Sequence, residues 1–220
     1  MTDVRIDVIA RLRALRLVPV IVIDDPRAAP PLGRSLVEGG LPCAEVTFRT
    51  AGASEALARL TGECPEVLAG AGTVLNPAQA KEARDAGAQF IVAPGFSLAV
   101  VDYCIENDIP VFPGIATPTE AEAALSRGLT VVKFFPAEPL GGLPYLKAIA
   151  APYGSLEFMP TGGITVQNVN SYLAYSRVVA CGGSWIARPE MIAAGDFDGI
   201  TGIVREAVSR VKPSPGARQV

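Results

Sequence analysis

The sequence of 220 residues contains no histidine. Histidine is the side chain most often used for proton transfer near neutral pH, and it is also the commonest metal ligand. Acid–base chemistry in this protein therefore falls to carboxylates, lysine, tyrosine or cysteine. Lysine is scarce as well, with four lysines against fifteen arginines.

Paired cysteines are also missing. The four cysteines, Cys43, Cys64, Cys104 and Cys181, are scattered and form no CxxC pair. We expect reduced thiols in a cytoplasmic protein, most of them filling the core. This spacing does not predict a zinc site, and we expect no metal and no cofactor.

Long apolar runs and strong charge of one sign are absent too. The apolar run at residues 18–23 is too short to cross a bilayer and is followed by Asp24 and Asp25. The net charge of -3 argues against a nucleic-acid or membrane partner but leaves room for a small anionic ligand.

Short apolar runs, rich in β-branched residues or ending in Gly or Pro, recur along the chain. They predict eight buried strands, at residues 18–23, 43–48, 66–71, 88–93, 109–114, 130–135, 156–160 and 177–182. Helical stretches separate them, with expected starts at Pro26, Asn76, Thr117 and Thr165.

This alternation predicts an α/β fold, a (β/α)8 TIM barrel with an extra N-terminal helix at residues 5–17. We expect one domain over residues 1–212 and a disordered tail at 213–220. In such a barrel, function belongs at the carboxyl ends of the strands.

Lys133 interrupts the apolar strand at residues 130–135. A charged amine is costly to bury unless it is paired. Burial disfavours the ammonium form of a lysine, and a neutral amine attacks carbonyl carbon. Catalysis and an interior ion pair with a carboxylate are both open at this point.

The strand at residues 43–48 carries Glu45, Thr47 and Arg49 at alternate positions, so the three share one face. That face would point into the barrel, since Ala44 and Val46 occupy the other. A carboxylate near Lys133 and Arg49 could act as a base. A structural salt-bridge network is the alternative.

The last two strands each end in a double glycine, Gly162–Gly163 and Gly182–Gly183. Glycines let backbone N–H groups close around a phosphate, and loops after strands seven and eight form phosphate sites in many barrels. The first pair leads directly into the helix expected from Thr165. Gly70 and Gly72 would let the backbone turn and expose Thr73.

These residues together predict a ligand that carries a carbonyl, a carboxylate and a phosphate. An imine on Lys133 would draw electrons from a neighbouring carbon–carbon bond, and an arginine grips a carboxylate with two hydrogen bonds.

Five separated segments resemble 2-keto-3-deoxy-6-phosphogluconate (KDPG) aldolase, a family also described as 4-hydroxy-2-oxoglutarate (KHG) aldolase. They are GLPCAEVTFRT from residue 40, GAGTVLNP from 70, GLTVVKFFPAEPLGG from 128, PTGGI from 160 and GGSW from 182. The resemblance implies a metal-free class I aldolase of the Entner–Doudoroff pathway, a (β/α)8 barrel and a homotrimer. Its substrate is a phosphorylated 2-keto acid, which it splits into pyruvate and glyceraldehyde 3-phosphate.

The resemblance also implies a role for each matching residue. Lys133 forms the imine and Glu45 moves protons. Substrate is bound by Arg49 and Thr73 at the pyruvate carboxylate, Pro94 and Phe135 around the pyruvyl group, Thr161 at the hydroxyl end, and Gly162, Gly163, Gly182, Gly183 and Ser184 at the phosphate.

Three other functions are less consistent with these residues. A sugar-phosphate epimerase relies on histidine-bearing metal sites, which this chain cannot build. An aldolase for the galactonate epimer has a different residue at the position of Thr161. A barrel that only binds sugar acids would need neither Lys133 nor Glu45.

Overall fold

The computed structural model describes residues 3–211, so the expected tail at 213–220 lies outside the described residues. Strands and helices alternate along the chain, as the sequence predicted. The strands are β1 (Leu17–Ile21), β2 (Cys43–Thr47), β3 (Leu68–Gly72), β4 (Phe90–Val92), β5 (Val111–Phe112), β6 (Gly114–Ile115), β7 (Val131–Phe134), β8 (Glu157–Pro160) and β9 (Cys181–Gly183).

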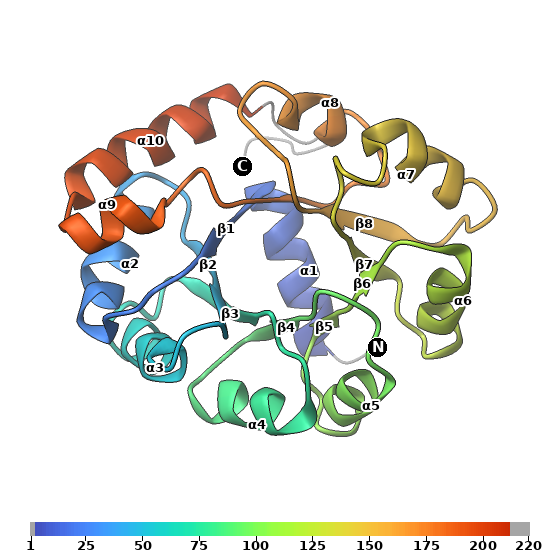
Figure 1. Ribbon diagram of the computed structural model, residues 1–220, viewed down its shortest axis with the longest axis horizontal. Helices are drawn as coiled ribbons and strands as arrows, with labels where there is room; N and C mark the ends of the chain where they lie inside the picture. Colours follow the sequence, from blue (N-terminus) through green and yellow to red (C-terminus); the bar gives the residue numbers. More distant parts are fainter. Residues whose placement is uncertain (1–2, 212–220) are drawn as a thin grey trace.

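The helices lie around the strands, and α1 crosses the centre of the view in Figure 1. They are α1 (Asp3–Leu15), the 3-10 helix η1 (Pro26–Ala28), α2 (Ala29–Glu38), α3 (Ala53–Glu63), α4 (Pro77–Asp85), α5 (Leu98–Glu106), α6 (Pro118–Ser126), α7 (Gly142–Ala150), α8 (Val169–Leu173), α9 (Pro189–Ala194) and α10 (Phe197–Arg210).

The strands form two parallel sheets. One has the order β5-β4-β3-β2-β1-β9, and the other has the order β6-β7-β8. Isolated parallel bridges join Phe158 to Val178 and Thr161 to Gly182. The described ladders are therefore not one continuous eight-stranded ring, and the observed architecture is an α/β fold with curled parallel sheets.

Several expected boundaries were wrong. The strand expected at 109–114 is divided into β5 and β6 because Pro113, which has no N–H to donate, stands between them. The first helix ends at Leu15 rather than at residue 17, and β1 starts at Leu17. Two helix starts are confirmed: the side chains of Asn76 and Thr117 accept backbone N–H groups from the first turns of α4 and α6.

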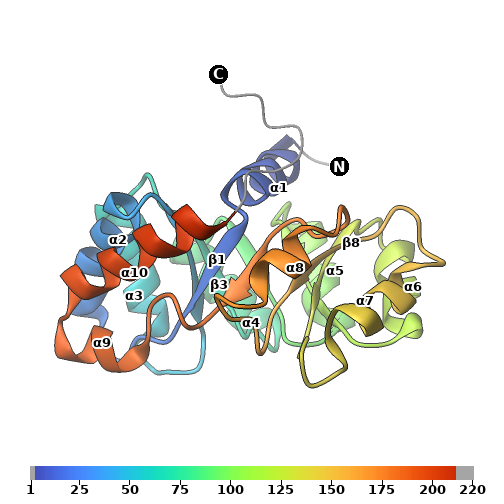
Figure 2. The same cartoon turned by 90° about the horizontal axis from the view of Figure 1, so that it is seen from above.

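An inner apolar cluster fills the amino end of the strand array. Its α1 members are Val8, Ile9 and Leu12, and its strand members include Val18, Cys43, Leu68, Phe90, Phe112, Val131 and Met159. Several of these are the first residues of their strands, so α1 covers the amino ends. Figure 2 shows α1 on one side of the molecule, above the strands.

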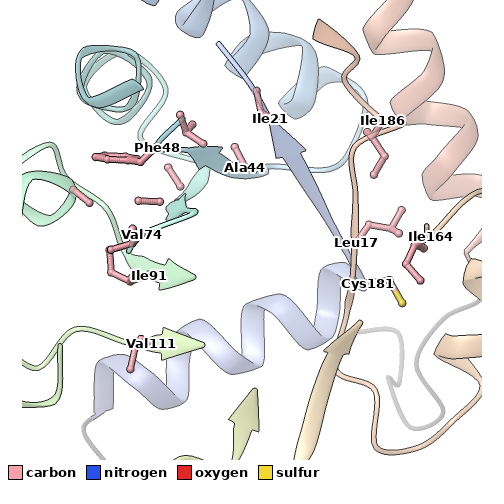
Figure 3. Packing of buried hydrophobic residues seen from close by; sticks show 14 of the residues in the cluster. Leu17, Ile21, Ala44, Phe48, Val74, Ile91, Val111, Ile164, Cys181 and Ile186 are labelled. Carbon is pink, nitrogen blue, oxygen red and sulfur yellow. The ribbon is translucent and has the colours of Figure 1, made fainter. Parts of the chain in front are cut away.

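A larger outer cluster packs the other face of the strands against the surrounding helices. Figure 3 shows part of it, with Ala44 from β2 and Ile91 from β4 among the labelled residues. Ala44 and Val46 belong to this outer cluster, whereas Cys43 belongs to the inner one. Because side chains alternate along a strand, Glu45 must face inward with Cys43.

Candidate active site

The centre of the site is an ion pair between β7 and β2. The amine Nζ of Lys133 lies 3.3 Å from Oε1 of Glu45, and the two side chains are 7% and 1% exposed. Both follow the inner apolar layer toward the carboxyl ends of their strands. Nζ also lies 5.1 Å from the centroid of the Phe135 ring. This contact fits both interpretations that the sequence left open for Lys133, catalysis and an interior ion pair.

Two glycines of β3 leave space for buried side chains of neighbouring strands. A Cβ on Gly72 of β3 would overlap Oε1 of Glu45, and a Cβ on Gly70 would overlap the ring of Phe90. Both glycines are in a regular strand with no positive φ. The expectation that they form a turn was therefore wrong; their role is to leave space.

Arg49 and Thr73 meet just beyond the ends of β2 and β3. Nε of Arg49 donates a hydrogen bond of 3.1 Å to the hydroxyl of Thr73, which has a φ of 57°. Arg49 is exposed and has no carboxylate partner among the described residues. Its terminal nitrogens are thus available to an anionic ligand.

The carbonyl oxygen of Pro94 lies against β6, the strand that pairs with the Lys133 strand β7. Gly114 pairs with Lys133 in the β6–β7 ladder, and a Cβ on Gly114 would overlap the carbonyl oxygen of Pro94. The sequence analysis missed Gly114, although a glycine next to a proline in an expected strand signals a close approach of two backbones.

The two glycine pairs lie side by side after β8 and in β9. Thr161 forms a parallel bridge with Gly182, and a Cβ there would overlap the Thr161 hydroxyl. Gly162 and Gly163 have φ values of 98° and 81°, a region that favours glycine. Ser184 is exposed at the turn after β9.

One expectation about this loop was wrong. The helix expected from Thr165 begins at Val169, so the glycine pair does not run directly into it. The side chain of Asn168 accepts from the Thr165 N–H and donates to the Gly163 carbonyl, and the Val169 N–H donates to the Thr165 carbonyl. These local bonds hold residues 163–168 in a turn.

The remaining lysines differ from Lys133 in exposure. Lys81 pairs with Asp85 on the surface, and Lys147 is exposed beside Tyr175. Lys212 lies outside the described residues.

All four cysteines are free and buried. Burial raises the pKa of Cys43 to about 12, because the thiolate would be poorly solvated.

Neither a metal-binding cluster nor a membrane-spanning helix occurs within residues 3–211. No three His, Cys, Asp or Glu side chains in this range lie in an arrangement that could hold a metal ion. No helix in the same range has the length and apolar character needed to cross a membrane.

Comparison with known proteins decides the family. The family model "Aldolase: KDPG and KHG aldolase" matches residues 8–203. The chain belongs to the KDPG and KHG aldolase family. It is therefore a carbon–carbon lyase, as the resemblance implied.

Relatives of this family agree over nearly the whole chain. A 2-dehydro-3-deoxy-phosphogluconate aldolase of Treponema pallidum is 48% identical over 206 residues, which cover 94% of this chain and 98% of the relative. A solved KDPG aldolase of Legionella pneumophila, with pyruvate captured as a covalent carbinolamine, has a TM-score of 0.87 and 38% identity, covering 91% of this chain and 97% of that one.

A third similar protein is the KDPG aldolase of Zymomonas mobilis, solved with 3-phosphoglycerate. It has a TM-score of 0.86 and 36% identity, and the match covers 94% of this chain and 97% of that one. These aldolases were solved with a keto acid and with a phosphorylated acid, which are the two chemical parts that the sequence predicted for the ligand.

Proposed function

We propose that this aldolase cleaves KDPG into pyruvate and glyceraldehyde 3-phosphate through an imine on Lys133. The observation that carries the proposal is the enclosed amine of Lys133, 3.3 Å from the carboxylate of Glu45. An amine and a proton carrier within reach of each other are what imine chemistry requires.

The first stage joins enzyme and substrate. Glu45 takes a proton from the Lys133 ammonium, and the neutral amine then adds to the keto carbon C2 and gives a carbinolamine. Loss of water then produces the protonated imine. Glu45 takes up and returns the protons of these steps, because its carboxylate is the acid–base group beside the amine.

The second stage breaks the C3–C4 bond. Removal of the proton from the C4 hydroxyl lets that oxygen form the aldehyde, and the bonding electrons move to the imine nitrogen to give an enamine. Glyceraldehyde 3-phosphate leaves. Protonation at C3 and addition of water then release pyruvate and regenerate the amine.

Arg49 and Thr73 are assigned to the pyruvate carboxylate, since the guanidinium lies at the carboxyl end of β2 and already donates to the Thr73 hydroxyl. Pro94 and Phe135 are assigned to the wall around the pyruvyl group. The Phe135 ring contacts the Lys133 amine, and the Pro94 carbonyl lies against Gly114, which pairs with Lys133 in the β6–β7 ladder.

The other end of the substrate is assigned to the loops after β8 and β9. Thr161 would contact the hydroxyl end, and Gly162, Gly163, Gly182, Gly183 and Ser184 would bind the phosphate with backbone N–H groups and the serine hydroxyl. The Thr161–Gly182 bridge supports this assignment because it brings the two loops together. KHG has the same keto-acid half but no phosphate, so we propose it as a second, poorer substrate.

We further propose that the two sheets act as one closed eight-stranded barrel. Only Pro113 separates β5 from β6, and the bridges at Val178 and Gly182 link β8 to the β9 side. A single domain over residues 1–212 is supported by an outer core cluster that runs from Leu17 to Ala207.

Assembly and location complete the proposal. We expect a homotrimer, as the family resemblance implies, and its mass can be measured by light scattering. A cytoplasmic location is supported by four unpaired cysteines, which suit a reducing compartment.

Trapping tests the mechanism. Borohydride and pyruvate should add one reduced pyruvyl group to the peptide carrying Lys133, as read by mass spectrometry. Lys133→Arg should abolish the adduct because a guanidinium has no neutral amine, whereas Lys147→Arg should keep it. An adduct on Lys81 or Lys147, or none, contradicts the proposal. Comparing kcat/KM for KDPG, its galactonate epimer and KHG then ranks the substrates.

A further inference from the structure

Tyr172 and Glu138 form a polar pair behind the double-glycine loop. Tyr172 of α8 is buried, with 1% exposed, and its hydroxyl donates a hydrogen bond to Oε1 of Glu138, which is exposed. Two causes raise the pKa of Tyr172: burial, which is the larger, and this hydrogen bond. The hydroxyl therefore keeps its proton and remains a donor. The chemistry proposed above uses neither residue.

Glu138 is in direct contact with the loop. Its backbone N–H donates to the carbonyl of Gly162 at 3.0 Å, and a Cβ on Gly163 would lie 2.6 Å from the Cβ of Glu138. Gly142, at the start of α7, packs on the same pair, since a Cβ there would lie 3.1 Å from Glu138 Oε1 and 3.2 Å from the Tyr172 hydroxyl.

These contacts determine which way the loop amides point. In a planar trans peptide the carbonyl and the following N–H point in opposite directions. Because Glu138 holds the Gly162 carbonyl, the N–H of Gly163 points away from Glu138. Asn168 holds the Gly163 carbonyl at 3.0 Å, so the N–H of Ile164 likewise points away from Asn168.

The two amides are free to bind a ligand. Within residues 3–211, neither Gly163 N–H nor Ile164 N–H donates to a protein acceptor. Gly163 is itself exposed. Successive unpaired N–H groups of this kind form an anion-binding concavity.

We propose that Tyr172 and Glu138 are positioning residues that select for phosphorylated substrates by holding the loop that presents the Gly163 and Ile164 N–H groups in its anion-binding orientation. Tyr172 fixes the Glu138 side chain, whose Cβ and Cγ lie against Gly163, and the backbone N–H of Glu138 holds the Gly162 carbonyl. This inference rests on the proposed phosphate site, and it adds residues that act on the phosphate without touching it.

Tyr172→Phe tests the inference, because it removes one hydroxyl and keeps the buried ring. We expect KM for KDPG to rise about tenfold, the size of one hydrogen bond to a charged acceptor, with kcat unchanged. The kcat/KM for KHG, which has no phosphate, should not change. Inhibition of KHG cleavage by inorganic phosphate should weaken by the same factor as KDPG binding.

The chain offers a matched control. The hydroxyl of Tyr153 also donates to a glutamate, Glu122, at 3.0 Å, but Glu122 belongs to α6, away from the glycine loop. Tyr153→Phe should leave both substrates unaffected. At position 138, Glu138→Gln retains an acceptor for Tyr172 and should behave like the wild type, whereas Glu138→Ala should reproduce Tyr172→Phe.

The outcomes separate this inference from the proposed function. If the wild type prefers KDPG over KHG but Tyr172→Phe lowers both activities equally, the pair is only structural and the inference is overturned. If the wild type shows no preference for the phosphorylated substrate and no inhibition by inorganic phosphate, the phosphate site itself is wrong and the inference fails with it. Loss of imine trapping at Lys133 would instead contradict the mechanism alone.

Discussion

Gly72 of β3 packs directly against the carboxylate of Glu45 on the neighbouring strand. The two strands pair in parallel, with Glu45 opposite Gly70 and Thr47 opposite Gly72. A side chain at position 72 would occupy the space of the Glu45 carboxylate, which is 1% exposed. The lack of a side chain at Gly72 on the adjacent strand therefore determines where the Glu45 carboxylate lies.

Gly72→Ala should displace the Glu45 carboxylate from the amine. We expect kcat/KM for KDPG to fall on the order of 10², the cost of misplacing a catalytic group by about 1 Å. Gly62→Ala in α3 is the control, since a Cβ there meets nothing within 4 Å. Steady-state kinetics give kcat/KM for the two variants. Equal kcat/KM values would mean that the Glu45 side chain has room to adjust.

Glu45→Gln should keep the carbon framework of the site and remove its proton carrier. Imine formation with pyruvate should persist, while turnover falls by about 10²–10⁴, the usual contribution of general acid–base catalysis. Borohydride trapping and kcat are measured on the same preparation. Unchanged turnover would show that another group moves the proton.

Arg49→Lys should weaken binding of the pyruvate carboxylate, because an ammonium cannot form two parallel hydrogen bonds to it. The concentration of pyruvate needed for half-maximal methyl-proton exchange, followed by NMR in D2O, should rise about tenfold. Arg59→Lys is the matched control: Arg59 pairs with Glu55 on the surface of α3. A similar rise in this concentration for both variants would show that Arg49 does not bind the pyruvate carboxylate.

Ile9→Ala should destabilise the protein by opening a cavity beneath the strand array. Ile9 is 9% exposed in the inner cluster, and loss of a buried isoleucine side chain costs about 2–5 kcal/mol in the free energy of unfolding. Ile6 lies on the same helix but is 49% exposed, so Ile6→Ala should cost much less. Urea unfolding compares them. Equal losses would mean that α1 does not support the inner layer.

Much of the site follows from local pattern. Glu45 and Arg49 could be placed on one face because side chains alternate along a strand, and Lys133 was conspicuous as a charge among apolar neighbours. Asn76 and Thr117 identified two helix starts because each cap is satisfied within its own first turn. Such features depend on residues a few positions apart.

Other features could not be predicted in this way. Thr165 looked like a helix start, but residues 163–168 form a turn to which the Asn168 side chain bonds on both sides, and the helix begins at Val169. Pro113 divides one expected strand because its backbone cannot donate. In both cases one local preference overrode another.

Local sequence patterns are enough to predict the alternation of strands and helices, the family and the chemical identity of the reactive groups. The contact of Lys133 with Glu45, 88 positions away, and that of Tyr172 with Glu138 depend on the folded chain. Alternation along a strand fixes the face on which a side chain lies, but the register between strands and the packing of helices fix which group lies opposite.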